Sequence, residues 1–389
     1  MSLALINGRV LTDAGFAEDR VVVLSAGRIE AVIGNDQWQA ERARRDGKQS
    51  VYDLQGQRLV PGFVDTQVNG GGGVLFNDDP SVDSIVEIGR AHRRYGTTGF
   101  LPTLISDDLD IVVQAVRAVQ TAMEIGVPGV LGIHIEGPFL NEERKGVHDG
   151  TKLRWLDEDA LDMLTALNGG RTLVTLAPER TSPQVIRKLA DAGIIISAGH
   201  TNGTYEEIKD ALSQGLTGFT HLFNAMSQLT GREPGAVGAA LDDPDSWCGI
   251  IVDGHHVDPV VLRIAMRSKR PDRFMLVTDA MPSVGAPSKA FKLQGRPISV
   301  SDSMLLDEHG RLAGSDIDMA SAVRNAVSML GVKLEQSLRM ASQYPAEFLR
   351  LGHELGRIVP GYRANLALLD AQLNVVETWI DGRRAAEPG

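Results

Sequence analysis

The hydrophobic residues of this chain follow two different patterns. Up to about residue 59, short runs in which apolar and polar residues alternate are separated by turn pairs such as Asn7-Gly8. This alternation is typical of short antiparallel strands that are joined by tight turns. After Pro61-Gly62, short apolar runs alternate with longer stretches whose apolar residues recur with a helical period. The second pattern predicts repeated β–α units around a parallel sheet.

Eight apolar runs of strand length lie in this second part of the chain. Helical stretches separate them, and several begin near a proline, where a missing backbone N–H costs little. A (β/α)8 barrel needs eight such units, whereas open doubly wound sheets rarely place so many so regularly. We therefore predict a TIM-type barrel built from the runs 59–68, 98–104, 130–135, 172–176, 193–197, 216–220, 248–252 and 274–278.

The end of the chain returns to alternation. Two helical stretches end near residue 351, and the strand-like runs 365–369 and 375–380 follow. Two strand-rich ends that flank one barrel most simply pair with each other. We therefore predict an α/β protein of two domains. Residues 1–58 plus 354–389 form a small β-sandwich domain, and residues 59–353 form the barrel.

The composition narrows the classes of partner. The chain has 389 residues and a formal net charge of -11, from 39 Lys and Arg against 50 Asp and Glu. An acidic protein is poorly suited to bind nucleic acid or an anionic membrane surface. The sequence has no run of about 18 apolar residues and no signal-peptide pattern, so we expect a cytoplasmic protein. Its one cysteine, Cys248, excludes an internal disulfide and a cysteine-rich metal site.

Polar residues follow the predicted barrel strands, at the end of the barrel where active sites lie. Glu136 ends or follows the third run, His200 the fifth and His221 the sixth. One carboxylate and two imidazoles from different strands can supply the three protein ligands of a catalytic divalent metal and leave a position for water. Asp279 follows the eighth run, where it could take a proton from such a water and later deliver it to a leaving group.

Each of these residues has a simpler interpretation when it is taken alone. An isolated histidine is more often a hydrogen-bonded core residue, and Asp279 could cap a helix. The joint pattern at successive strand ends favours the metal site. His134 lies two residues before Glu136, and we expect it to support the site or to pack in the core. We assign no function to the other histidines at 92, 309 and 353, which we expect on the surface.

Eight short segments, taken together and in order, carry a resemblance to a known family. They are residues 61–70, 134–140, 145–148, 198–201, 220–226, 231–235, 253–258 and 277–280. With these segments the chain resembles the N-acetylglucosamine-6-phosphate deacetylases of the amidohydrolase superfamily, nearly from end to end. The resemblance implies a metal-dependent barrel with a small β-sandwich domain. It also implies hydrolysis of N-acetyl-D-glucosamine 6-phosphate to acetate and D-glucosamine 6-phosphate in amino-sugar catabolism.

The resemblance also implies roles for individual residues. Glu136, His200 and His221 would hold the metal, and Asp279 would be the catalytic general acid and base. His148 would hydrogen-bond the substrate and polarise the acetyl carbonyl. The other substrate-binding positions would be Val147 in the same loop, then Asn224, Ala225, Arg232 and His256 around the phosphate and sugar, and the backbone of Leu312, Ala313 and Gly314 over the hexose. A homodimer is implied, with Arg232 reaching the neighbouring site.

One departure from the wider superfamily is visible. Many amidohydrolases carry a His-x-His pair at the end of the first strand for a second metal, and here these positions are Gln67 and Asn69. An amide is a poor ligand for a transition metal beside imidazole, so we expect one divalent ion per subunit. Zn²⁺ is the first expectation, and the ligand set also tolerates Fe²⁺, Mn²⁺ or Co²⁺.

Two other functions remain open from the sequence. The first is the same chemistry on N-acetylgalactosamine 6-phosphate, which differs from the glucosamine sugar at one hydroxyl. The second is a non-catalytic barrel that senses a sugar phosphate or acts as a scaffold, because a fold alone does not fix a function. A non-catalytic barrel would be indicated by the loss of a metal-ligating residue or of the acid after the eighth run. Here all four residues are present: Glu136, His200, His221 and Asp279.

Overall fold

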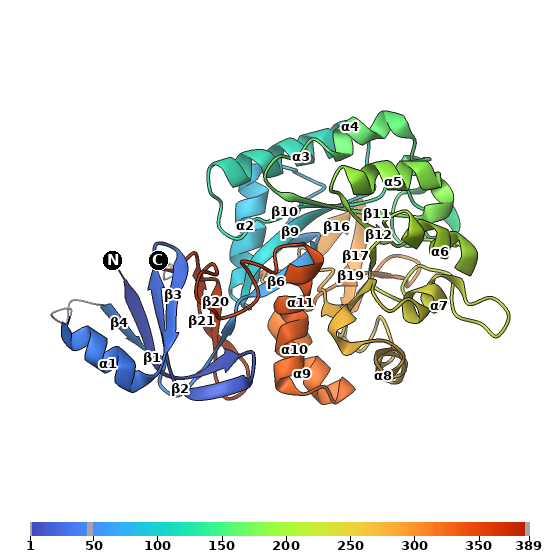
Figure 1. The fold of residues 1–389 in the computed structure, drawn as a ribbon. Coiled ribbons are helices and arrows are strands. Elements are labelled where there is room, and N and C mark those ends of the chain that lie inside the picture. Colours follow the sequence, from blue (N-terminus) through green and yellow to red (C-terminus); the bar gives the residue numbers. More distant parts are fainter. Residues whose placement is uncertain (1, 45–49, 303, 386–389) are drawn as a thin grey trace.

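The computed structural model describes residues 2–44, 50–302 and 304–385. Figure 1 shows a smaller, sheet-rich part that contains both chain ends and a larger part in which helices surround a ring of strands. Within the described ranges, no helix has the length and apolar character needed to cross a membrane. The two parts correspond to the two hydrophobic patterns of the sequence.

The ring is a parallel sheet of eight strands within the described residues, and their order in space is their order in the chain. The backbone N–H of Asp279 donates to the carbonyl of Gln67 at 3.0 Å and links the last strand to the first. This confirms the predicted (β/α)8 barrel. The strands are β6 (Phe63–Val68), β9 (Thr97–Ile105), β10 (Gly132–Glu136), β11 (Arg171–Leu176), β12 (Ile195–Ala198), β13 (Gly218–Phe219), β14 (Trp247–Ile250) and β15 (Phe274–Leu276).

Helices cover the outside of the ring, so the strands are buried on both faces and lack alternation. The apolar residues of each helix recur on the side that faces the strands. Several helices begin at a residue whose side chain caps the first turn, such as Ser182 before α5 and Thr204 before α6. The helices are α2 (Val82–Arg93), α3 (Leu109–Glu124), α4 (Leu161–Leu164), α5 (Pro183–Asp191), α6 (Tyr205–Ser213), α7 (Gly235–Asp242), α8 (Pro259–Ser268), α9 (Met319–Leu330), α10 (Leu334–Ala341) and α11 (Gln343–Phe348).

The two ends of the chain share one sheet, as predicted. Its order is β22-β21-β20-β5-β1-β2-β3, with β4 beside β1, and β20 pairs antiparallel with β5. The antiparallel pairing expected for the first part of the chain holds only in part, because β1 runs parallel to β4 and β5. The strands are β1 (Leu3–Thr12), β2 (Gly15–Ser25), β3 (Arg28–Ile33), β4 (Ser50–Asp53), β5 (Arg58–Pro61), β20 (Leu366–Leu369), β21 (Val375–Ile380) and β22 (Arg383–Arg384).

Helix α1 (Asn35–Arg44) was not predicted. Its Trp38 is buried against Ala4, Val21 and Val23 on one face of the terminal sheet. The rest of the helix is polar except for the exposed Ala40 and Ala43, so the sequence around it has no apolar stripe that would reveal a helix. One tryptophan therefore carries the packing of this element.

The run predicted at 59–68 is two strands that break at Gly62. Strand β5 belongs to the terminal sheet, and β6 begins the barrel. An ideal Cβ at Gly62 would lie only 2.0 Å from Oγ1 of Thr98. The missing side chain lets the chain pass from the terminal sheet into the barrel while it touches β9. The small sheet therefore extends to residue 61.

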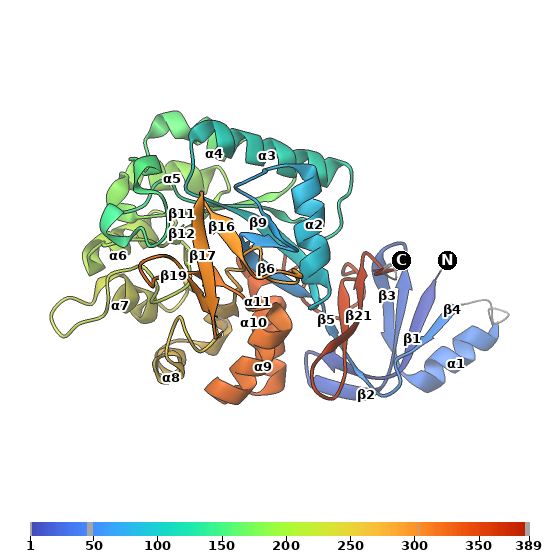
Figure 2. The same cartoon turned by 180° about the vertical axis from the view of Figure 1, so that it is seen from behind.

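A second small sheet, which the sequence analysis did not predict, is formed by the chain between the end of β15 and the start of α9, and Figure 2 shows it. Its four strands within the described residues pair in chain order and antiparallel. Ser315, at its end, donates its backbone N–H to the carbonyl of Asp279 at 2.9 Å. The strands are β16 (Phe291–Leu293), β17 (Arg296–Ser301), β18 (Met304–Leu306) and β19 (Leu312–Ser315), and a further short hairpin joins β7 (Gly70–Gly71) to β8 (Val74–Leu75).

Gly62→Ala is expected to lower the free energy of unfolding by about 1–3 kcal/mol, because the added methyl group overpacks the contact with Thr98. Gly231→Ala is the matched control, since no heavy atom lies within 4 Å of its ideal Cβ, and it should change stability by less than about 0.5 kcal/mol. Chemical denaturation of both variants measures the difference. Equal stabilities would contradict the close packing at Gly62.

Candidate active site

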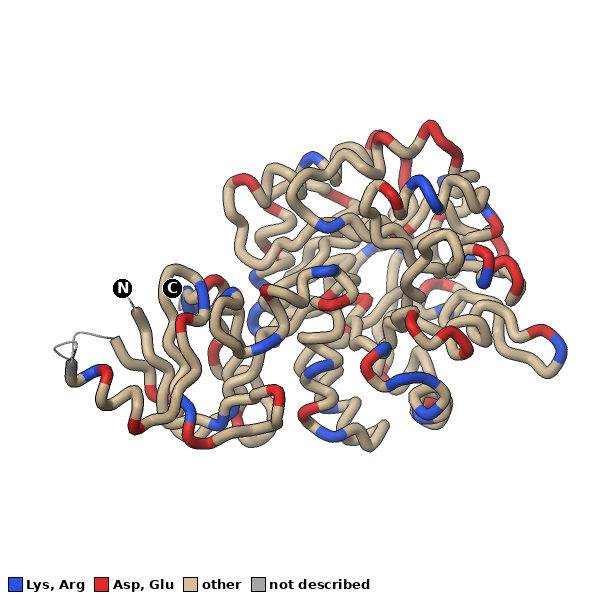
Figure 3. Tube along the Cα trace, in the orientation of Figure 1, with Lys and Arg blue, Asp and Glu red and all other residues tan. Residues whose placement is uncertain are grey.

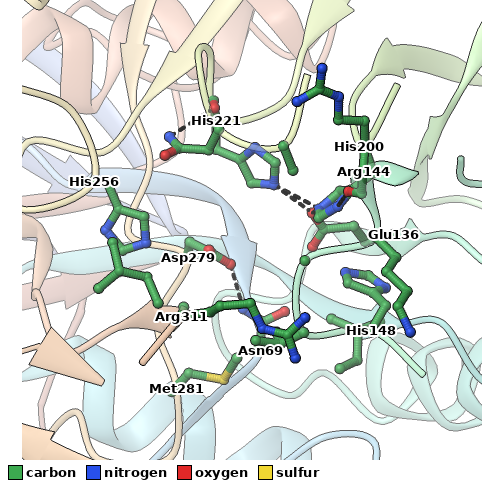
Figure 4. A pocket seen from close by; sticks show the side chains of 18 of the residues that line it. Asn69, Glu136, Arg144, His148, His200, His221, His256, Asp279, Met281 and Arg311 are labelled. Atoms are coloured by element: carbon green, nitrogen blue, oxygen red, sulfur yellow. Dashed lines mark hydrogen bonds and ion pairs between the residues drawn. The ribbon is translucent and has the colours of Figure 1, made fainter. Parts of the chain in front are cut away.

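Polar residues from several strand ends meet in one cavity of about 410 Å³. Glu136 is the last residue of β10, His200 and His221 follow β12 and β13, and Asp279 follows β15. His148 reaches the cavity from the loop after β10. Figure 4 shows these side chains converging from different elements. The structure thus brings together the residues that the sequence placed at the carboxyl ends of the strands.

Glu136, His200 and His221 form a tight buried cluster. Oε1 of Glu136 lies 3.2 Å from Nε2 of His200 and 3.0 Å from Nε2 of His221, and the two ring nitrogens are 3.0 Å apart. Burial tends to raise the pKa of Glu136, but the hydrogen bonds from both histidines outweigh it and hold the pKa well below its ordinary value. One carboxylate oxygen and two imidazole nitrogens at such spacing suit a single divalent metal.

The ring of His200 is oriented for this role by the backbone. Its Nδ1 lies 2.9 Å from the carbonyl oxygen of Arg144. A carbonyl oxygen only accepts, so Nδ1 carries a hydrogen, and Nε2 of a neutral ring could then bind a metal in place of its contact with Glu136. A metal-ligating histidine usually has such a partner on its other nitrogen. The donor set therefore fits a divalent ion in charge and type, and the ring of His200 also fits it in orientation.

His148 lies beside the cluster, and a second set of three groups includes it. One ligand atom each of Glu136, His148 and His200 lies within 4.8 Å of the others. However, Nδ1 of His148 accepts the backbone N–H of Ser106 at 3.3 Å, and burial holds the pKa of His148 well below its ordinary value. The neutral ring therefore carries its hydrogen on Nε2, where it donates rather than ligates. This favours His221 over His148 as the third ligand.

Asp279 shares a hydrogen-bond network with the two amides that replace the His-x-His pair. Its Oδ1 accepts from Nδ2 of Asn69 at 2.6 Å and from Nε2 of Gln67 at 3.1 Å. Nε2 of Gln67 also lies 3.1 and 3.0 Å from the two oxygens of Glu136. Burial, and then the charge of Glu136, raises the pKa of Asp279 to about 7. A carboxyl group of this kind can both take up and release protons near neutral pH.

The backbone at the strand ends adopts an uncommon conformation. His200, His221, Ala225 and Asp279 have φ angles of 49°, 31°, 50° and 51°. Residues other than glycine rarely adopt positive φ, and each such residue costs about 1–3 kcal/mol. Strained backbone that the surrounding structure enforces is a common property of functional sites.

Glu179, in the 3-10 helix Pro178–Arg180 after β11, ties together the loops that flank the cluster. Its Oε1 accepts from Nδ2 of Asn141 at 2.9 Å and from the N–H of Asn202 at 2.6 Å. Its Oε2 accepts from Oγ1 of Thr201 at 2.5 Å. The N–H of Asn141 in turn donates to the carbonyl of His200 at 2.9 Å. One carboxylate thus fixes the loops after β10 and β12 relative to each other.

The other histidines divide between expected and unexpected positions. His134 is buried beneath Glu136, and its two ring nitrogens contact hydroxyl groups of Thr103 and Thr175 at 3.3 and 2.8 Å. The expectation that His92 lies on the surface is wrong. It is fully buried, and its Nε2 lies 2.9 Å from the carbonyl of Gly70. Its position four residues after Ile88 on the apolar face of α2 could have revealed this.

The predicted substrate-binding residues fall into two groups. Those that line the cavity are Val147, His148, Asn224, Ala225, His256, Leu312 and Gly314. Ala313 instead points into a small apolar cluster with Leu293 and Leu305. Arg232 is exposed on the loop before α7 and does not line the described cavity of its own chain. Nδ1 of His256 lies 2.6 Å from Oδ2 of Asp253, so a partly buried acid holds its ring.

Sequence reasoning missed several cavity residues. Arg144 and Lys145 line the cavity from the loop after β10. Lys145 is the first residue of the segment 145–148 that carried the resemblance, yet neither residue was assigned a role. Arg311 reaches the cavity from the end of the β18–β19 hairpin. It was missed because the sheet that carries it was missed. Arg144 and Lys145 had a signal, since they directly precede Gly146-Val147-His148.

Comparison with known proteins agrees with this geometry. Residues 58–385 match the sequence model of the Amidohydrolase family. An N-acetylgalactosamine-6-phosphate deacetylase of Shewanella sp. (strain ANA-3) is 40% identical, over 96% of this chain and 93% of that protein. An N-acetylglucosamine-6-phosphate deacetylase of Haemophilus influenzae is 36% identical, over 98% and 99%. The crystal structure of N-acetylglucosamine-6-phosphate deacetylase from Pasteurella multocida has a TM-score of 0.93 and 35% identity, over 100% of both chains.

Proposed function

Because the chain belongs to the amidohydrolase family, among its amino-sugar phosphate deacetylases, we propose that it hydrolyses N-acetyl-D-glucosamine 6-phosphate. The products are acetate and D-glucosamine 6-phosphate, in amino-sugar catabolism in the cytoplasm. The buried cluster of Glu136, His200 and His221 beside Asp279 carries this proposal, because amide hydrolysis needs an activated water molecule and a proton carrier. The relative from Shewanella supports N-acetylgalactosamine 6-phosphate as the second candidate substrate.

The metal site is proposed to hold one divalent ion per subunit. Glu136, His200 and His221 would be its ligands, with Zn²⁺ as the first choice and Fe²⁺, Mn²⁺ or Co²⁺ as alternatives. When bound, such an ion lowers the pKa of water toward about 7 and draws electron density from a carbonyl oxygen. Gln67 and Asn69 donate their N–H groups to carboxylates, which supports one ion rather than two.

The other site residues move protons and orient the amide. Asp279 is proposed to accept the proton of the attacking water and to pass it to the leaving amine, which departs poorly when it is not protonated. Its pKa of about 7 supports both steps. Nε2–H of His148 donates to the acetyl oxygen and stabilises the charge that develops there. Asn69 and Gln67 hold the Asp279 carboxylate in place.

The substrate-binding residues are proposed to act around the sugar and its phosphate. His256, fixed by Asp253, and Asn224 with Ala225 would hold the phosphate and sugar from within the subunit. The exposed loop that carries Arg232 would reach the site of a neighbouring subunit, in a homodimer. Val147 and the backbone of Leu312, Ala313 and Gly314 would shape the space for the hexose.

The division of the chain follows the sheets. We propose that residues 1–61 with 354–389 form the smaller domain and residues 62–353 form the catalytic barrel. The antiparallel pairing of β5 with β20 supports placing β5 in the smaller domain. The catalytic residues all come from the barrel segment.

Acetate release from the two epimeric N-acetylhexosamine 6-phosphates tests the function. We expect metal-supplemented enzyme to have a higher kcat/KM for the glucosamine sugar than for the galactosamine sugar, and a lower one for unphosphorylated N-acetylglucosamine. A preference for the galactosamine sugar would change the substrate assignment and leave the chemistry in place. No acetate from either phosphate would overturn the deacetylase assignment.

Asp279→Asn is expected to lower kcat by about 10²- to 10⁴-fold, because the amide can neither accept nor deliver the proton. Metal content should stay unchanged, since the proposed ligands are intact. Asp245→Asn is the matched control, because Asp245 is exposed and lies outside the cavity, and its kcat should equal that of the parent protein. Near-normal turnover of Asp279→Asn would remove this residue from the mechanism.

Metal analysis by mass spectrometry should return one equivalent of divalent ion per chain after dialysis. Glu136→Gln should lose most of this metal, because the charged ligand of the cluster is gone. Gln67→Glu is a useful companion variant, since it replaces an amide with a ligand that a second ion prefers. Two equivalents in the parent protein would contradict the role given to Gln67 and Asn69.

A further inference from the structure

Arg311 is a positively charged residue that lines the cavity. It is not among the residues that we expected to bind the substrate. It directly precedes β19, whose Leu312 and Gly314 also line the cavity. Strand β19 is fixed to the catalytic strand end, because the N–H of Ser315 donates to the carbonyl of Asp279 at 2.9 Å. Figure 4 shows the Arg311 side chain extending over the cavity. Its position is therefore set by the same backbone that positions Asp279.

The guanidinium of Arg311 is held in place by a buried acid. Nε and Nη2 lie 2.8 and 2.7 Å from Oδ2 of Asp307. The other oxygen of Asp307 accepts the backbone N–H groups of His309 and Arg311, both at 2.9 Å, which closes the β18–β19 turn. The Asp307 side chain is 3% exposed, whereas that of Arg311 is 44% exposed. The acid is part of the turn, and the guanidinium extends from it towards solvent and the cavity.

This arrangement leaves hydrogen-bond donors directed at a ligand. Nε and Nη2 each use one N–H on Asp307, and Nη1 has no partner within the described part of the chain. A guanidinium fixed in this way loses little conformational freedom when it binds an anion, and its planar fork suits phosphate. The ion pair alone explains little, because partly exposed pairs contribute little to folding stability.

We propose that Arg311 binds the phosphate of the substrate from within the subunit, an inference that rests on the proposed function. The cavity is lined by four acidic residues, so a dianionic substrate needs fixed cations nearby to enter it. These acids are Glu136, Glu142, Glu143 and Asp279. Arg232, the cation expected at the phosphate, is exposed outside the cavity of its own chain. Arg311, like Arg144 and Lys145 in the same cavity, is a cation that needs no neighbouring subunit.

Binding measurements with Arg311→Gln test this proposal. Titration calorimetry with D-glucosamine 6-phosphate should show a Kd raised about 10- to 100-fold, the loss expected for hydrogen bonds to a charged group. The Kd of D-glucosamine should change at least tenfold less. Arg311→Lys, which keeps the charge and loses the fork, should fall between the parent and Arg311→Gln. Lys292→Gln is the control, because Lys292 is exposed on β16 outside the cavity, and both Kd values should stay unchanged.

The outcomes separate the role of Arg311 from the proposed function. Equal losses for glucosamine and its phosphate would place Arg311 against the sugar ring and overturn the phosphate assignment, as would an unchanged Kd for the phosphate. If the parent protein releases no acetate from either hexosamine phosphate, the deacetylase assignment fails. Titration with inorganic phosphate then still decides whether Arg311 binds an anion, since a weaker Kd in Arg311→Gln supports the site and an equal Kd removes it.

Discussion

The burial of one carboxylate between two imidazoles is the constraint on which the rest of the structure depends. Removing a carboxylate from water costs several kcal/mol unless other groups replace the solvent. Around Glu136 the replacement comes from ring nitrogens of His200 and His221 and from the Gln67 amide, all within 3.2 Å. These groups come from different strands, so only a closed ring of strands brings them to one point. The site can therefore form only when the barrel is closed.

That requirement explains where the backbone is strained and how the strain is supported. His200, His221 and Asp279 leave their strands with positive φ, which turns each side chain toward the cavity. The cost of about 1–3 kcal/mol per residue is offset by hydrogen bonds that lie just outside the cluster. Glu179 fixes the segments around His200, and the N–H of Ser315 fixes Asp279. Loops and the inserted sheet thus hold the strand ends in the conformation that the site needs.

The sequence predicted the parts of the structure that repeat, and it missed the parts that occur once. Barrel strands are buried on both faces and helices on one, so their apolar residues form regular patterns. The cluster of Glu136 with two histidines follows from the same regularity, because parallel strands end at a common edge. Helix α1 packs through Trp38 alone, and β16 to β19 are short and partly exposed. Such elements leave no periodic signal, and Arg311 was missed with the sheet that carries it.

The net charge of -11 describes the whole chain and not the cavity. Lys and Arg are interspersed with Asp and Glu over both parts of the molecule, as Figure 3 shows. Salt screens exposed charges, so that at physiological ionic strength their effect extends over only about 8 Å. A small anion in the cavity therefore interacts mainly with the few charged groups at the cavity rim. Arg144, Lys145 and Arg311 line that cavity beside its four acidic residues. A polyanion would extend beyond them and meet the acidic surplus elsewhere. The acidic surplus of the chain therefore disfavours a nucleic acid, whereas the cations of the cavity still suit a single phosphate group.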